Sequence, residues 1–163
     1  MAFILKKGNM RFRRLTSEEL SHLEKEFIEF LVANTVTADD WIKLKDEKPE
    51  NAEELIEMFS DVVLLKVYSK IVLLEKRAKN DLLLFKFDGD MIQMLGVSSQ
   101  DESIDFTDFG KKSFDLKGIK LEGFKTTKVL AKESKPDEVF QLLESGCYIG
   151  NVELYKTLDA IIE

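Results

Sequence analysis

The chain has 163 residues, of which 44% are hydrophobic and 34% are charged, and its formal net charge is -7. This composition predicts a soluble globular protein with one core of ordinary size, because two prolines and eight glycines are too few for a Pro/Gly-rich linker. The longest apolar runs, residues 71–74 and 82–85, are far shorter than the about 20 residues of a membrane span, so we expect no membrane association. With one cysteine and no visible export signal, we expect a cytoplasmic protein.

Basic residues gather at the start of the chain. Residues 1–14 contain two lysines, three arginines and no acid, whereas residues 15–64 carry a net charge of -10. We therefore expect a basic N-terminal arm over residues 1–14, which can be flexible, followed by a single α+β domain over residues 15–163.

The first helix is predicted from a capping box. Thr16 and Glu19 have the spacing at which the Glu19 amide donates to the Thr16 hydroxyl and the Thr16 amide donates to the Glu19 carboxylate. Apolar residues then recur at helical spacing as far as Leu31, and Asn34 is a suitable stop. One helix is therefore expected from Thr16 to Asn34.

Two further helices are expected next. Thr37 precedes two acids and begins a short helix that ends before Pro49, because a residue that precedes proline disfavours helical geometry. Pro49 and the acids after it open a third helix. Its predicted apolar face carries Leu55, Met58, Phe59, Val62 and Leu65.

The hydrophobic period changes at Lys66. This lysine falls in the middle of the apolar face of the third helix, so the helical pattern fails there. Residues 67–74 mix β-branched, aromatic and leucine side chains, as a strand buried on both faces does. We favour a strand over residues 67–74, and a helix that continues to Arg77 is the alternative, because short apolar runs fit both.

A hairpin over residues 82–97 is the clearest strand signal. Asp88 and Gly89 separate two apolar runs, and this dipeptide suits a type I′ turn with positive φ at both central residues. We expect the Phe-bearing face of the hairpin to meet the helices. That face carries Leu83, Phe85 and Phe87.

Weaker strand signals and two helices complete the chain. Residues 98–110 are predicted as an acidic loop, and residues 113–116, 119–122 and 125–130 as short strands. Pro136 opens a helix that ends near Gly146, and Asn151 caps a last helix. The predicted architecture is an N-terminal helical layer packed on a small antiparallel sheet, with the hairpin central, closed by a C-terminal helix pair.

Several segments resemble a family of small bacterial proteins described only as a domain of unknown function. They are residues 10–20, 24–27, 49–55 and 75–77, which resemble the opening of the family, and residues 143–149. The resemblance covers most of residues 10–163 and carries no activity. It implies a family-like start at Met10, which would make residues 1–9 an extension or an alternative leader.

No catalytic, metal or phosphate motif stands out, and we expect no metal and no cofactor. His22 is the only histidine and lies opposite the apolar face of its helix, so we interpret it as a surface residue. Cys147 has no cation adjacent in sequence and is interpreted as a packed structural cysteine. The oxygen-bearing residues from Asp101 resemble an EF-hand loop, but its sixth and twelfth positions hold Phe106 and Lys112.

The basic arm is the best candidate binding site. Arg11, Phe12, Arg13 and Arg14 combine three cations with an aromatic ring, which could grip phosphates and stack a base as basic arms do on RNA. The acidic body of the protein would repel a polyanion. Pairing of the arm with acidic helices, within the chain or between copies, is the alternative.

Three functions stay open. The favoured one is a non-enzymatic cytoplasmic protein–protein interaction module, able to self-associate. The second is an RNA- or ribosome-associated protein that uses the arm together with the lysine-rich residues 111–135. The third is a small-ligand binder or enzyme with acidic residues in a cleft, which requires a concave pocket with at least two convergent polar groups.

Overall fold

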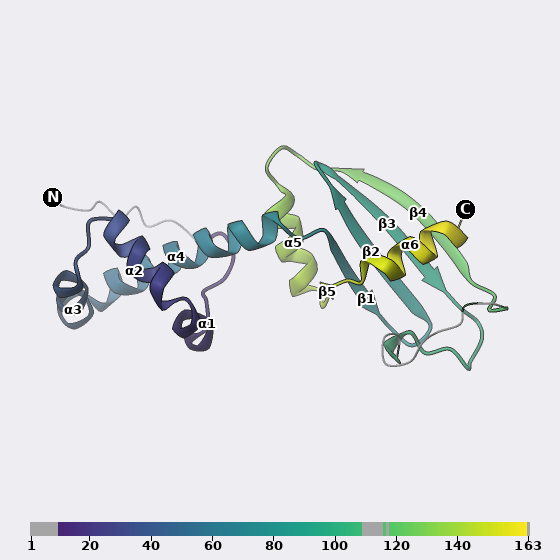
Figure 1. Cartoon of the computed structure of the whole chain (residues 1–163), viewed down its shortest axis with the longest axis horizontal. Coiled ribbons are helices and arrows are strands. Elements are labelled where there is room, and N and C mark those ends of the chain that lie inside the picture. Colours follow the sequence, from purple (N-terminus) through teal and green to yellow (C-terminus); the bar gives the residue numbers. More distant parts are fainter. Residues whose placement is uncertain (1–9, 109–115, 117, 163) are drawn as a thin grey trace. The chain divides into compact units, whose positions relative to one another are not determined.

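The computed structural model describes residues 10–108, 116 and 118–162. The α+β class is confirmed, because N-terminal helices precede a five-stranded antiparallel sheet and a helix follows the last strand (Figure 1). The chain divides into two compact units, residues 1–67 and 68–163, which are described separately. The division into an arm and one domain stays a prediction. Among the described residues, no helix combines the length and the apolarity that crossing a membrane requires.

The helices of the first unit are α1 (Ser17–His22), α2 (Glu24–Ala33), α3 (Ala38–Glu47) and most of α4 (Pro49–Ser69). Both predicted caps are confirmed, since Thr16 and Thr37 each close a capping box. The prediction of one helix from Thr16 to Asn34 was wrong, because Leu23 leaves helical geometry with φ -112° and ψ 22°. The Ser21 hydroxyl donates to the Glu18 carbonyl, and such side-chain bonds compete with the helical backbone ladder.

Four aromatic rings pack together in the first unit. The ring centroid of Phe27 lies 5.2 Å from that of Trp41 and 5.0 Å from that of Phe59, and Phe30 lies 5.4 Å from Phe59. Such pairs add about 0.5–1.5 kcal/mol each beyond the burial of their area. The rings therefore join α2, α3 and α4 into one packed unit.

The strand predicted over residues 67–74 was wrong in its position. Helix α4 continues through Lys66 to Ser69, and strand β1 begins at Leu73. The buried side of α4 changes along the helix: Leu55 and Phe59 are buried in its first part, and Leu64 and Tyr68, on nearly the opposite side, are buried in its last part. Val62, on the predicted face, is 55% exposed. Lys66 continues the side of Leu55 and Phe59 but is exposed, because that side is no longer buried at this end of α4, so it does not interrupt the helix. The alternative of a helix as far as Arg77 was wrong as well, because β1 runs from Leu73 to Arg77.

The second unit is built on a sheet with the strand order β4-β3-β2-β1-β5. Its strands are β1 (Leu73–Arg77), β2 (Asp81–Asp88), β3 (Met91–Ser98), β4 (Glu122–Val129) and β5 (Tyr148–Ile149). The hairpin of β2 and β3 is confirmed, but its two-residue turn is Gly89 and Asp90. Of these two residues only Gly89 has positive φ, at 56°, so the turn has the type II′ pattern and not the predicted type I′ pattern.

The other strand predictions were only partly right. Strand β4 overlaps the predicted segments 119–122 and 125–130, which the structure joins through residues 123–124 into one strand from Glu122 to Val129. Residues 116 and 119–121 are not in a strand, and residues 113–115 lie outside the described residues. The short β5, which pairs with β1, was not predicted, because a strand of two residues has no recognisable period.

Helices α5 (Lys135–Glu144) and α6 (Val152–Ile161) cover different faces of the sheet. Helix α6 lies along the sheet (Figure 1). Its Tyr155 and Leu158 join the core on the face of β2 that carries Leu82 and Leu84, here called the Leu face. On the opposite face, here called the Phe face, Lys135 of α5 lies 5.5 Å from the ring centroid of Phe87. The expectation that the Phe-bearing face meets the helices was therefore incomplete, since α6 packs into a core on the Leu face. That core includes Leu73, Leu95, Val97, Ile104, Phe106, Tyr155, Leu158 and Ile162.

Candidate functional site

The arginines of the predicted arm contact acids of the first unit. Arg13 makes a bidentate pair with Glu19, with both nitrogen–oxygen distances at 2.8 Å, and Arg14 pairs with Glu53 at 2.9 Å. The Arg13 hydrogen bond, followed by the one from the Thr16 amide, lowers the pKa of the Glu19 carboxyl from its ordinary 4.5 to about 2. Pairing of the arm with acidic helices within the chain is thus observed for these two arginines.

Phe12 is a core residue with 6% of its surface exposed. The amides of Arg11 and Phe12 donate to the two carboxylate oxygens of Asp61, at 2.7 and 2.9 Å, and the Leu15 amide donates to the Ser60 hydroxyl at 3.0 Å. The Arg11 guanidinium lies 5.0 Å from the centroid of the Phe12 ring. Residues 11–15 are therefore attached to α4, and a base could stack on Phe12 only after the ring had left the core.

The other residues singled out in the sequence carry no assembled chemistry. His22 is exposed, and its Nδ1 lies 2.8 Å from the carbonyl oxygen of Glu18. Cys147 is buried, as predicted for a packed cysteine. The Asp101 carboxylate accepts bonds from the amide and hydroxyl of Ser103. In the described part of the chain, no group of three or more His, Cys, Asp or Glu side chains could hold a metal ion.

A buried ion pair lies on the Leu face of the sheet. Glu75 is 2% exposed, and its Oε1 lies 2.6 Å from a guanidinium nitrogen of Arg77. The Asn151 amide, just before α6, donates to Glu75 Oε2 at 3.3 Å, and Arg77 donates to the Phe106 carbonyl. Burial, with Glu75 nearby, raises the pKa of the Tyr148 hydroxyl. Both charges are thus satisfied within the chain, and we assign the pair a structural role.

Strand β4 forms a long and exposed edge of the sheet. All eight of its residues are exposed, whereas β5 at the opposite edge has two residues. The Leu130 amide donates to the Asp90 carbonyl, next to β3. Counting back from Leu130, every second residue of β4 therefore directs its N–H and C=O groups toward β3. The intervening residues direct their N–H and C=O groups outward, away from the sheet. They are Gly123, Lys125, Thr127 and Val129.

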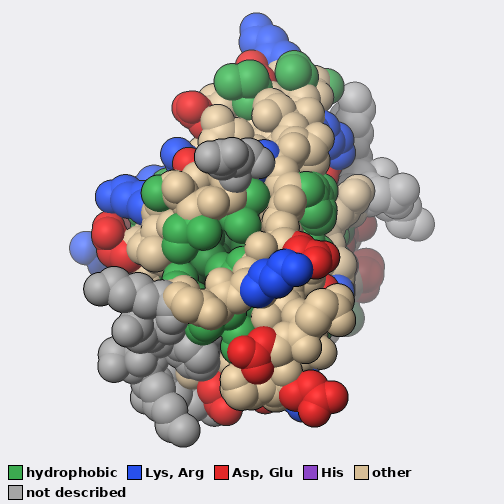
Figure 2. Space-filling model, turned by 90° about the vertical axis from the view of Figure 1, so that its right-hand side faces the viewer, with side chains coloured by type: hydrophobic (Ala, Val, Ile, Leu, Met, Phe, Trp, Pro, Cys, Tyr) green, Lys and Arg blue, Asp and Glu red, His purple; other side chains and the backbone are tan. Residues whose placement is uncertain are grey.

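Apolar and charged side chains both lie near this edge. Val129 is 73% exposed and Phe124 is 50% exposed, both on β4. Figure 2 shows one face of the molecule, on which hydrophobic side chains gather in the middle with charged side chains around them. The edge therefore offers apolar contacts as well as backbone groups.

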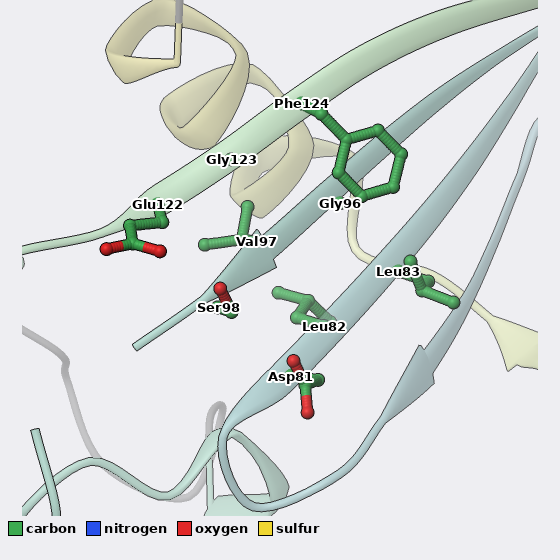
Figure 3. A pocket seen from close by; sticks show the side chains of 9 residues that line it. All are labelled: Asp81, Leu82, Leu83, Gly96, Val97, Ser98, Glu122, Gly123 and Phe124. Atoms are coloured by element: carbon green, nitrogen blue, oxygen red, sulfur yellow. The ribbon is translucent and has the colours of Figure 1, made fainter. Parts of the chain in front are cut away.

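A pocket of about 310 Å³ lies beside β4 on the Phe face of the sheet (Figure 3). Three rows of cross-strand neighbours line it, each with one residue from β2, β3 and β4, and the two outer rows have their side chains on the Phe face. The polar row is Asp81, Ser98 and Glu122, and the apolar row is Leu83, Gly96 and Phe124.

Gly96 allows the Phe124 ring to lie across β3. A Cβ atom at Gly96 would be only 2.2 Å from Cε1 of Phe124, so any other residue would displace the ring. Two strand spacings of about 4.8 Å separate β2 from β4. Asp81 and Glu122 therefore stand on either side of the pocket, with Ser98 between them (Figure 3).

The pocket has the chemistry of a cation site. Among the described residues, no cation forms an ion pair with the carboxylate of Asp81 or Glu122. An aromatic ring beside two carboxylates favours an ammonium or guanidinium group that carries an alkyl chain. Sequence reasoning missed this site, because its residues come from three strands whose pairing was not predicted. The only local signals were the glycines at positions 96 and 123.

A family model described as a family of unknown function, DUF6495, matches residues 10–163. The match includes the strands of the sheet, the pocket and residues 11–14. No curated protein and no solved structure matches the chain significantly.

Proposed function

Because the chain belongs to DUF6495, a family of unknown function, we infer its role from the surface of its own structure. We propose that it is a non-enzymatic protein–protein interaction module of the cytoplasm. The module binds an extended protein segment along the outer edge of β4. One observation carries the proposal, namely the row of outward backbone groups on a strand with eight exposed residues. A segment that pairs with these groups adds a strand to the sheet, and its main-chain hydrogen bonds supply affinity.

Lysines on an edge strand commonly prevent such pairing, and β4 carries two. Here both are held by acids of the same unit. Lys125 lies 3.1 Å from an Asp159 carboxylate oxygen, and Lys128 lies 2.9 Å from Oε1 of Glu138. Because these acids compensate the charges, the lysines repel an approaching strand less than free lysines would.

A pair of variants at Thr127 tests the proposal. Thr127→Pro removes an outward N–H without removing a bond to β3, whereas Thr127→Val keeps the N–H and serves as the matched control. In affinity purification from the native cell, with and without RNase, a direct partner should be retained by Thr127→Val and lost by Thr127→Pro. The purified partner should also slow hydrogen exchange of the Lys125 and Thr127 amides. A partner that binds both variants equally and protects neither amide would contradict the proposal.

The pocket favours a second candidate function, the binding of a small organic cation. Its volume of about 310 Å³ is at the lower end of the range of small-molecule sites. The two carboxylates attract the cationic group, and Phe124 contacts it through its ring face. This candidate fits the small-ligand hypothesis and needs no catalytic residue.

Titration calorimetry with agmatine, a guanidinium and ammonium compound, tests the second candidate. Asp81→Asn should weaken binding about tenfold, because it removes one of two carboxylates, while Glu102→Gln, an exposed acid elsewhere in the unit, should leave binding unchanged. Equal binding by the wild type and Asp81→Asn would exclude the pocket as the site. RNA association through the arm stays a prediction, which normal RNA binding by an Arg11, Arg13 and Arg14 triple alanine variant would contradict.

A further inference from the structure

We infer that the segment bound by β4 is β4 of a second copy of this chain, paired antiparallel around Lys125. The inference rests on the proposed binding edge and names its occupant. Identical edges can meet across a two-fold axis perpendicular to the sheet, which makes one continuous sheet from two copies. Such an interface is self-complementary, so every favourable contact occurs twice.

Backbone geometry limits the possible registers. Hydrogen-bonded pairs can form only between residues whose N–H and C=O groups point outward on both strands. With Lys125 opposite Lys125 of the second copy, Gly123 stands opposite Thr127, and both belong to the outward set. This register gives about six backbone hydrogen bonds between the copies.

Charge complementarity selects this register among the possible ones. Centred on Lys125, the pairing places Glu122 opposite Lys128 of the second copy, and it places Phe124 opposite Thr126. All four side chains lie on the Phe face, so each pair is a direct cross-strand contact. A shift of the centre to any neighbouring residue of β4 moves Glu122 away from Lys128. Opposite charges at directly opposed positions are favourable in antiparallel pairs.

The one like-charged contact in this register is between the two copies of Lys125. Each Lys125 is held by its own chain, since its Nζ donates to the Asp159 carbonyl at 2.7 Å and lies 3.1 Å from the Asp159 carboxylate. The lysine charges are therefore drawn toward α6 on the Leu face and are compensated there. Lys128 contacts Glu138 but keeps 61% of its side chain exposed.

Light scattering on a size-exclusion column tests the inference. The full chain should elute as a species of twice 18.8 kDa that dissociates on dilution. Thr127→Pro should shift it to the monomer, and Thr127→Val should not. Glu122→Lys should weaken the dimer roughly tenfold, because two favourable pairs become repulsive. The triple variant Glu122→Lys, Lys128→Glu and Glu138→Lys should restore it, since it also keeps opposite charges at the contact between positions 128 and 138. Glu102→Lys serves as a matched surface control.

The charge variants keep the test valid if Thr127→Pro fails to fold, which circular dichroism reveals. A wild type that stays at 18.8 kDa at the highest soluble concentration overturns the inference. So does a dimer that the triple variant fails to restore. If the wild type is monomeric and a different partner is still lost by Thr127→Pro, only the inference fails and the proposed function stands.

Discussion

Neutralising Glu19 should weaken the first unit in a pH-dependent way. Glu19→Gln removes the charge that pairs with Arg13 but keeps a side-chain oxygen able to accept from the Thr16 amide, so the variant isolates the ion pair from the cap. Arg13 and the Thr16 amide together lower the pKa of Glu19 to about 2 in the folded protein. The same carboxyl has an ordinary pKa of 4.5 when unfolded.

The magnitude follows from this difference in pKa. If the pair were buried, the change would correspond to about 3 kcal/mol of folding free energy. Both side chains are 38% exposed, so solvent screening reduces the expected contribution to about 1 kcal/mol. Folding lowers the pKa of the Glu19 carboxyl, so its contribution to the free energy of unfolding is complete above about pH 4.5. The contribution is lost as the pH falls toward about 2, because the unfolded state takes up the proton first.

Urea unfolding followed by circular dichroism measures this contribution. Between pH 5 and 7 the variant should be about 1 kcal/mol less stable than the wild type, and the two should converge as the pH approaches 2. Glu18→Gln, in the same helical turn, is the control and should show no such convergence. A difference between Glu19→Gln and wild type that is equal at low and neutral pH would refute the assignment of the effect to the ion pair.

Three further outcomes follow from the second unit. Arg77→Met should cost about 3–5 kcal/mol in urea unfolding, because it leaves the buried Glu75 without its cation; a cost below about 1 kcal/mol would contradict the burial of the pair. Gly96→Ala should displace the Phe124 ring from β3, and a crystal structure of the variant with the ring in its original place would contradict this contact. The Cys147 thiol should react with a thiol reagent only as fast as the protein unfolds, and rapid reaction in native buffer would exclude its burial.

Local patterns were sufficient for elements whose signals lie within a few residues. The capping boxes at Thr16 and Thr37 and the hairpin of β2 and β3 were predictable, because each depends on neighbouring residues and on their own backbone geometry. The break at Leu23 and the true end of α4 were not predictable. The first depends on side-chain bonds to one carbonyl, and the second on which stripe of the helix is buried.

The candidate site shows the same division. The sequence singled out Arg11, Phe12, Arg13 and Arg14 because clustered cations are visible in a linear chain. Only the tertiary structure placed Arg13 and Arg14 against Glu19 and Glu53 and buried Phe12. The pocket and the β4 edge left almost no linear signal, because their residues are neighbours only through strand pairing.

The sequence by itself determined the α+β class, the positions of the helix caps, the hairpin and the segregation of charge, since these follow from composition and from periods of a few residues. Tertiary structure alone decided which charges are compensated, which strand is left at the edge of the sheet, and which side chains line a pocket. Those properties depend on contacts between residues far apart in the chain. No local pattern encodes them, because the free energy of a salt bridge or a strand pair depends on the partner that folding brings near.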